Sequence, residues 1–343
     1  MNRWKLAGRV YHEAIFQGQL TAAGSNAARL TEKMAGSPNY IGKQGRMIQI
    51  LGSFYLLSVA VLALISFLEL RSIHAAGTEP VWTLLVASGS VALQLLIQAG
   101  YLIMLTILAT AEILAPDLYR WFESLPLSGI DVGSLKLLAL AREFLLPLAV
   151  IVVSTPLVAG FAGGSVVGGA VGLLVSVLHA AVILALVVLA SSGMRRVLRS
   201  ADGDDRGARA ARIVTMVVYG VGTLLVVFIM QIGSNVLARL FENPMLDAAA
   251  SARVLRIMAL LPLPTAPSVL LVTLGAISRG GAAIVSAALA LWMPVVGTLL
   301  YAALAGWLGR RALRVLRGES AYGGAAGSPP SREIGRASCR ERV

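Results

Sequence analysis

His179 is the residue whose type and setting most directly suggest chemistry, because it lies inside a long apolar stretch. A histidine in that setting can relay protons or ligate haem. Either role needs a second suitable group, and the other histidines, His12 and His74, fall in polar segments. We therefore expect His179 to pack and to form hydrogen bonds within a helical bundle.

Amide side chains form a second set of candidates. Gln94 and Gln98 stand about one helical turn apart, and Gln231 lies in a later apolar stretch. Amides in an apolar environment usually form hydrogen bonds to a neighbouring helix. The alternative is that Gln94, Gln98 and Gln231 line a path for a transported substrate.

Charged residues near the edges of apolar stretches are a third set. Glu112 lies near the end of one stretch, where water can reach it, and Arg142 and Glu143 are expected to pair with neighbouring groups at a membrane boundary. The sequence shows no catalytic carboxylate pair, metal-ligand cluster or nucleophile triad. We therefore expect no enzymatic activity in this chain and no metal or cofactor bound by it.

The composition indicates what positions these residues. The chain has 343 residues, of which 57% are hydrophobic and only 13% are charged, and its mean hydropathy is +0.80. Apolar runs long enough to cross a bilayer recur along it. These values predict an all-α polytopic membrane protein. The net charge of +12 does not indicate nucleic-acid binding, because the basic residues cluster in alternate loops, as cytoplasmic loops do.

Six membrane spans are expected, and they occupy residues 48–70, 81–114, 130–160, 171–191, 213–232 and 282–308. Pro147 and Pro156 should kink the third span, and the glycine-rich residues 160–169 should form a tight turn after it. Pro294 falls inside the sixth span. Residues 1–47 are polar and basic, and Trp4, Tyr11 and Ile15 lie near one helical face. This pattern predicts a helix that lies either on the inner membrane surface or in the cytosol.

Residues 241–278 are apolar, but Pro262, Pro264 and Pro267 interrupt them. We interpret this region as a re-entrant or surface-lying hairpin on the outer side, because an unbroken helix through three prolines is unfavourable. The alternative is a seventh span. Six spans leave most Lys and Arg on one side together with both termini, which the positive-inside rule assigns to the cytoplasm. A seventh span would weaken that charge bias.

The C-terminal residues divide into two parts. Residues 309–332 read as a basic cytosolic tail. Residues 333–343, EIGRASCRERV, look like the translation of a sequencing-library adapter, so Cys339 is expected not to be native and the natural C-terminus is unknown. No disulfide or thiol chemistry is implied. The expected division is a 1–47 N-terminal segment, a 48–308 six-helix transmembrane domain, the 309–332 tail and the adapter-like 333–343.

Residues 115–142 form a charged, proline-bracketed segment between two apolar runs. Pro116 suits the first position of a helix, and Pro126 prevents its continuation. Between them, one apolar stripe has the helical spacing i, i+3, i+4 and i+7, and its members are Leu118, Trp121, Phe122 and Leu125. Ser128 to Asp131 has the form of a capping box that would start the next helix. The short helix either lies in the lipid headgroups or fits a groove in a soluble partner, with Trp121 and Phe122 as anchors.

This segment resembles the region between the second and third helices of ABC-2 type transporter permeases. The match comprises Leu125-Pro126-Leu127-Ser128, then Asp131 and Lys136, and the expected layout of six spans with an outer re-entrant segment is also similar. The resemblance implies a coupling helix that docks on a separate ATP-hydrolysing subunit. Its contact residues would be Asp117, Leu118, Tyr119, Trp121, Phe122, Glu123 and Leu125.

An external source of energy agrees with the absence of a phosphate-binding loop from the sequence, since Gly42-Lys43 lacks the rest of that motif. The resemblance implies that ATP and Mg²⁺ bind in the partner. It also implies a second permease half, or a second copy of this chain, in the cytoplasmic membrane of a prokaryote, surrounded by lipid. Two other hypotheses remain, namely an ion-coupled secondary transporter and a non-transport scaffold or integral enzyme.

Overall fold

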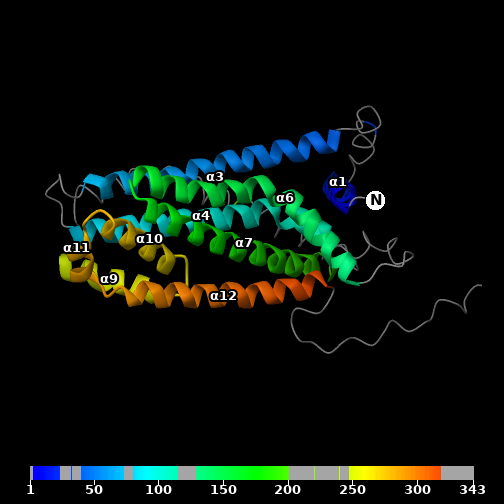
Figure 1. Cartoon of the computed structure of the whole chain (residues 1–343). Coiled ribbons are helices and arrows are strands. Elements are labelled where there is room, and N and C mark those ends of the chain that lie inside the picture. The colour runs from blue at the N-terminus through cyan, green and yellow to red at the C-terminus, as the bar shows by residue number, and fades with distance from the viewer. Residues whose placement is uncertain are drawn as a thin grey trace, which may run out of the picture.

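The computed structural model describes residues 3–23, 40–72, 80–114, 129–200 and 247–317, together with positions 32, 220 and 239. Every element in this part of the chain is a helix. The long helices pack lengthwise in one bundle (Figure 1), and they are α3 (Tyr40–Ser72), α4 (Pro80–Ile113), α6 (Gly129–Leu157), α7 (Val166–Ser200) and α12 (Trp292–Leu316). Shorter helices lie at the two ends of this bundle. The expected all-α fold is confirmed for the described residues.

Five described helices contain stretches long and apolar enough to cross a membrane, and these stretches are Gly45–Ile65, Pro80–Met104, Gly133–Ala162, Val166–Met194 and Trp292–Leu316. They correspond to five of the six expected spans. The remaining expected span, 213–232, lies outside the described residues apart from position 220. Outward-facing side chains on these helices are strongly apolar, since Phe54 is 72% exposed and Leu299 is 64% exposed. Such a surface is stable in lipid and unfavourable in water, which indicates a multi-pass membrane protein.

Helix α4 is the central element of the bundle. It packs against α3, α6 and α7, against α1 (Arg3–Ala23) at one end, and against α9 (Ala248–Leu260) and α10 (Thr265–Ile277) at the other. Leu84, Leu95 and Leu102 of α4 are fully buried. The buried apolar side chains form two clusters, and Tyr101 of α4 packs against both of them.

The two ends of the bundle differ in composition. One end holds α1, the start of α3 and the C-terminal ends of α4 and α12, and we call it the α1 end (Figure 1). The opposite end holds α9, α10 and α11 (Ala282–Ala288), and we call it the α11 end. Helix α1 packs against α6 and α4, and its Ala7, Val10 and Ala14 are buried.

Helices α6 and α7 form a tight antiparallel hairpin. The chain continues through Pro147 and Pro156 as helix and then widens into a π-helical turn, Val158–Ala162. Gly164 makes the reversal with a φ of +60°, a conformation that favours glycine. The turn occupies only residues 163–165 and not the whole of 160–169, because residues on both sides of it remain helical.

The structure corrects the expected sixth span. The prediction of an unbroken helix over 282–308 is wrong, because Leu289 adopts an extended conformation between α11 and α12. The span begins at Trp292, so Pro294 lies in the first turn of α12 and not in its interior. A proline there costs little, since the first turn of a helix has no intrahelical acceptors for its N–H groups.

Helices α9 and α10 are joined by a short break and bent by 119° relative to each other. Asp247 caps α9 by accepting a hydrogen bond from the Ala250 N–H at 2.6 Å. Pro264 precedes α10, whose residues from Ala266 to Thr273 are all buried. The expected break is therefore confirmed; it falls at Pro262 and Pro264, whereas Pro267 lies in the first turn of α10.

Candidate functional site

One group of polar side chains meets in the bundle interior around α4. Gln94 and Gln98 are completely buried. The Gln94 amide donates to the Thr155 hydroxyl of α6 at 3.4 Å, and the Gln98 amide donates to the Leu56 carbonyl of α3 at 3.3 Å. The expected hydrogen bonding between helices is thus confirmed for both residues. The Oε1 atoms of both side chains are buried and have no partner among the described residues.

His179 of α7 completes this interior site. Its Nε2 lies 2.9 Å from the Leu95 carbonyl of α4, and its Nδ1 lies 2.9 Å from the Tyr301 hydroxyl of α12. The Leu95 carbonyl can only accept, so Nε2 carries the hydrogen and the Tyr301 hydroxyl donates to Nδ1 of the neutral ring. His179 therefore joins three helices, and the expected packing and hydrogen-bonding role is confirmed.

A second polar site lies at the α1 end and joins α1, α3 and α6. Its centre is Gln49 of α3, whose Nε2 lies 3.0 Å from the Tyr11 hydroxyl of α1. The same nitrogen donates to the backbone carbonyls of Arg142 and Glu143 at 3.1 and 3.0 Å. These carbonyls belong to α6, where Pro147 has no N–H for the Glu143 carbonyl. Gln49 thus satisfies an acceptor that a helical proline leaves unpaired.

The side chains of Arg142 and Glu143 point to different partners. The Arg142 guanidinium stacks over the Trp4 ring at 4.6 Å and lies against Gly8, both on α1. The Glu143 carboxyl is 6% exposed and accepts from the Thr110 hydroxyl of α4 at 3.5 Å. Both side chains thus contact groups of neighbouring helices, and their expected position at a membrane boundary stays a prediction. A side chain at position 8 would overlap the guanidinium, which explains why glycine fits there.

Two groups of α1 near this site have shifted pKa values. Burial raises the pKa of the Tyr11 hydroxyl, and the nearby Glu143 carboxyl raises it further. Burial lowers the pKa of His12 below 6.5, and the positive charges of Arg142 and Arg46 add to that effect. Both groups are therefore neutral at neutral pH.

The structure locates only some of the residues that the sequence singles out. Helix α6 begins at Gly129, where the Ser128–Asp131 pattern predicts its start, so Asp131 lies in its first turn. Lys136 is buried in α6 and makes contacts of its own. Other predicted site residues lie outside the described residues, and they are Asp117, Leu118, Tyr119, Trp121, Phe122, Glu123, Leu125, Pro126, Ser128 and Gln231.

Sequence reasoning missed the partners at both sites. Thr155, Tyr301 and Gln49 come from helices distant in sequence from the residues they contact, and no periodic pattern marks them. Tyr11 is the exception, because its helical face with Trp4 is visible in the sequence. Among the described residues no group of three or more His, Cys, Asp or Glu side chains could hold a metal ion.

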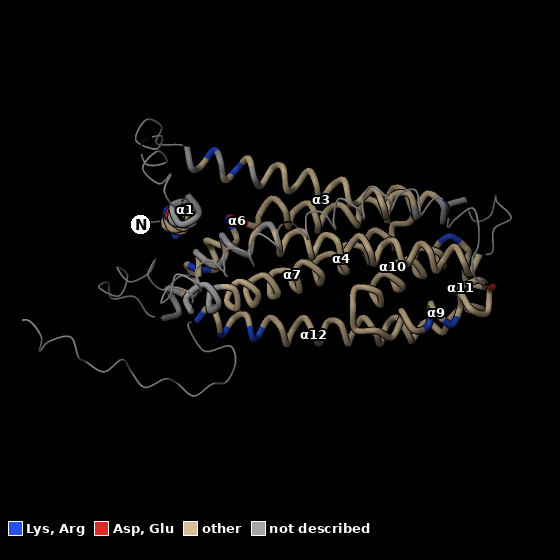
Figure 2. The backbone as a smooth tube through the Cα atoms, turned by 180° about the vertical axis from the view of Figure 1, so that it is seen from behind, with Lys and Arg blue, Asp and Glu red and all other residues tan. Residues whose placement is uncertain are grey.

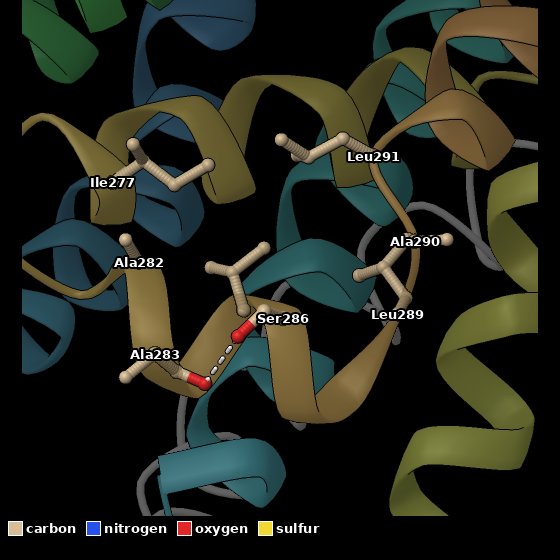
Figure 3. Close-up of a pocket in the computed structure, with 8 residues that line it drawn as sticks. Ile277, Ala282, Ala283, Ser286, Leu289, Ala290 and Leu291 are labelled. Carbon is tan, nitrogen blue, oxygen red and sulfur yellow. Dashed lines mark hydrogen bonds between the residues drawn. The ribbon is translucent and has the colours of Figure 1, made fainter.

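A cavity of about 480 Å³ lies at the α11 end, beside α11 and the extended residues that follow it (Figure 3). Its walls are apolar and include Ile277, Val285 and Leu291. The hydroxyl of Ser286 donates to the Ala283 carbonyl at 2.9 Å within the same helix. The cavity therefore lacks the convergent polar groups that orient a specific ligand.

Basic residues are unevenly distributed between the two ends, as Figure 2 shows. At the α1 end they occupy α1, α3 and α12, and they include Arg3, Lys5, Arg9, Lys43, Arg46, Arg310, Arg311, Arg314 and Arg317. At the α11 end Arg253 and Arg256 lie on α9, and Arg279 follows α10.

Comparisons of the chain with protein-family models, curated proteins and solved structures find no match.

Proposed function

We propose that this chain is the membrane-spanning permease subunit of an ATP-driven ABC exporter. A separate ATPase subunit would dock on residues 117–125 and supply the energy. The proposal rests on the resemblance of residues 125–136 to ABC-2 permeases, and one structural observation supports it. Leu114 and Gly129, the described residues that flank the proposed docking segment, both lie at the α1 end.

The α1 end is the more basic end of the bundle (Figure 2). Basic residues concentrate on the cytoplasmic side of membrane proteins, so we assign the α1 end to the cytoplasm. A connection between the ends of α4 and α6 would then meet the compartment that contains ATP and soluble ATPases. The same assignment puts the N-terminal segment, residues 1–47, and the 309–332 tail on the cytoplasmic side.

The bundle also offers a route for force from that connection. Helix α4 precedes the docking segment and packs against nearly every other described helix, and α6 follows the segment. Closure of two ATPase subunits would move the segment, and α4 and α6 would follow as levers. A pathway between this bundle and a second permease half, or a second copy of this chain, would then change the side on which it is open.

We assign α9 and α10 to a re-entrant hairpin on the outer side of the membrane. The 119° bend supports this assignment over a single span, and so does the position of both helices at the α11 end. Helix α10 packs against α4, α7 and α12 and is almost entirely buried, as expected of a segment that enters the bundle from one end.

The docking proposal is tested by copurification. The chain is expressed with an ATPase encoded beside its gene, and the Trp121→Ala/Phe122→Ala double variant is compared with the wild type. We expect the double variant to lose the ATPase, because aromatic anchors dominate binding at interfaces of this kind. Retention of the ATPase by the double variant would contradict the proposed docking site.

The matched control removes one aromatic side chain at the opposite end of the bundle. Trp292→Ala truncates an exposed tryptophan at the start of α12, at the α11 end, and we expect it to retain the ATPase. Helical content measured by circular dichroism should be equal in all three proteins. Substrate transport that continues after complete ATP depletion and stops with an uncoupler would instead favour an ion-coupled transporter.

A further inference from the structure

Glu143 has a buried carboxyl group that plays no part in the proposed function. It is the middle residue of α6, lies within a candidate membrane span, and follows Arg142, whose side chain contacts α1. It is 6% exposed, and its recorded hydrogen-bond partner is the Thr110 hydroxyl at 3.5 Å. The Tyr11 hydroxyl of α1 lies near it, linked through the Gln49 amide to the backbone carbonyl of Glu143.

The cationic side chains nearest to this carboxyl do not pair with it, although the Arg142 Nε is itself buried without a hydrogen-bond partner among the described residues. The Arg142 guanidinium is stacked on Trp4 and lies against Gly8, and adjacent residues of a helix point in different directions. Lys136 lies two turns earlier on α6, about 10 Å along the helix axis, and makes contacts of its own. On α1 the nearby titratable groups are Tyr11 and His12, both neutral at neutral pH, while Arg46 of α3 lies near His12. In the described part of the chain, no cation is recorded in contact with the Glu143 carboxyl.

An ionised carboxylate in this position would be unfavourable. The free energy needed to remove a carboxylate from water is larger than the free energy gained from one long hydrogen bond with a neutral hydroxyl. No ion pair makes up the difference. A carboxyl in these surroundings avoids the cost by taking up a proton. The neutral acid then has an O–H group, for which the Thr110 and Tyr11 oxygens are the nearby acceptors.

We propose that Glu143 is a proton-binding site whose occupancy is coupled to the docking of α1. When α1 is docked, a proton taken from water forms an O–H bond with the Glu143 carboxylate. When α1 separates and water reaches the site, that bond breaks and the proton returns to water, leaving the solvated carboxylate. The inference is independent of the proposed ATPase docking, because it concerns contacts among α1, α3, α4 and α6 only.

The protonation state is measured by infrared spectroscopy of the full-length chain in lipid at neutral pH. The C=O stretch of a neutral carboxylic acid is separate from the bands of a carboxylate. We expect the wild-type minus Glu143→Gln difference spectrum to contain a neutral-acid band, and the wild-type minus Glu13→Gln spectrum to lack one. Glu13 is the matched control because it is an exposed carboxyl on α1. A carboxylate band in the Glu143→Gln difference spectrum would overturn the proposal.

The coupling to α1 is measured by hydrogen exchange of the α1 amides as the pH is raised. Wild type and Glu143→Gln are compared at each pH, so the intrinsic pH dependence of exchange cancels. We expect α1 to exchange faster in the wild type than in Glu143→Gln at alkaline pH, because only the wild type acquires a buried charge. Equal exchange at every pH would overturn the coupling. ATPase copurification is unaffected in either case, so this test and that of the proposed function fail separately.

Discussion

At the scale of single residues, the bundle interior is organised by a few polar contacts between distant helices. His179 takes its two partners from α4 and α12, and Gln94 and Gln98 connect α4 to α6 and α3. Apolar side chains in lipid have little preference for one neighbouring helix over another, whereas a polar group must find its partner. These contacts therefore fix which helices adjoin α4, and substitutions there should affect stability out of proportion to their size.

The Tyr301→Phe variant tests the His179 site. It removes the hydroxyl that donates to Nδ1 and leaves that nitrogen buried without a partner. We expect the free energy of unfolding in detergent to fall by about 1 kcal/mol. Tyr55→Phe is the matched control, because the Tyr55 hydroxyl is buried and has no hydrogen-bond partner among the described residues. Its removal should leave stability unchanged or raise it, and an equal loss in both variants would contradict the role of His179.

At the scale of elements, close helix packing depends on where glycine and alanine fall. Helix α12 crosses α9 and α10 at Gly297, where a Cβ atom would overlap the Ala259 carbonyl oxygen and lie 2.8 Å from the Ala266 Cβ. Gly172 of α7 similarly lies where a Cβ atom would be 3.0 Å from the Pro156 Cα of α6. Small residues at such crossings let helix backbones approach closely, which is a main source of packing energy in lipid.

Gly297→Ala should therefore destabilise the protein, by about 1–3 kcal/mol, because the added methyl group forces α12 away from α9 and α10. Gly306→Ala on the same helix is the control, since no atom lies within 4 Å of the Cβ position there. Alanine is a better helix former than glycine, so that variant should be neutral or more stable. Thermal unfolding of the two variants in the same detergent measures the difference. A loss of stability in both would mean that the crossing is not the cause.

At the scale of the whole molecule, the two ends of the bundle should face opposite sides of the membrane. In a Cys339→Ser background, cysteine is introduced at Lys43 near the α1 end or at Val166, the first residue of α7, and both positions are exposed. A membrane-impermeant maleimide should label Val166→Cys in intact cells and Lys43→Cys only after permeabilisation. The reverse pattern would contradict the assignment of the α1 end to the cytoplasm and, with it, the proposed ATPase docking.

The sequence alone predicts an all-α polytopic membrane protein. It also predicts the approximate positions of five long helices, α3, α4, α6, α7 and α12. Each of these properties is local, because an apolar run of sufficient length forms a span whatever its neighbours. The start of α6 at Gly129 is local in the same way, since a proline and a capping pattern precede it. The break at Leu289 was not predicted, because residues 282–308 contain no strong helix breaker except Pro294, which lies in the first turn of α12.

Only the tertiary structure decides that α4 is central, that Tyr11 of α1 lies near Glu143, and that Tyr301 and Gln49 are the partners of His179 and Tyr11. The physical reason is that membrane helices are surrounded by lipid and not by water. In water, the apolar face of a helix marks the side that is buried, but in lipid both the buried and the outward faces are apolar. Sequence periodicity therefore cannot distinguish the lipid-facing Phe54 from the buried Leu56 two residues later. Only the contacts between helices in the folded chain distinguish the buried position from the lipid-facing one.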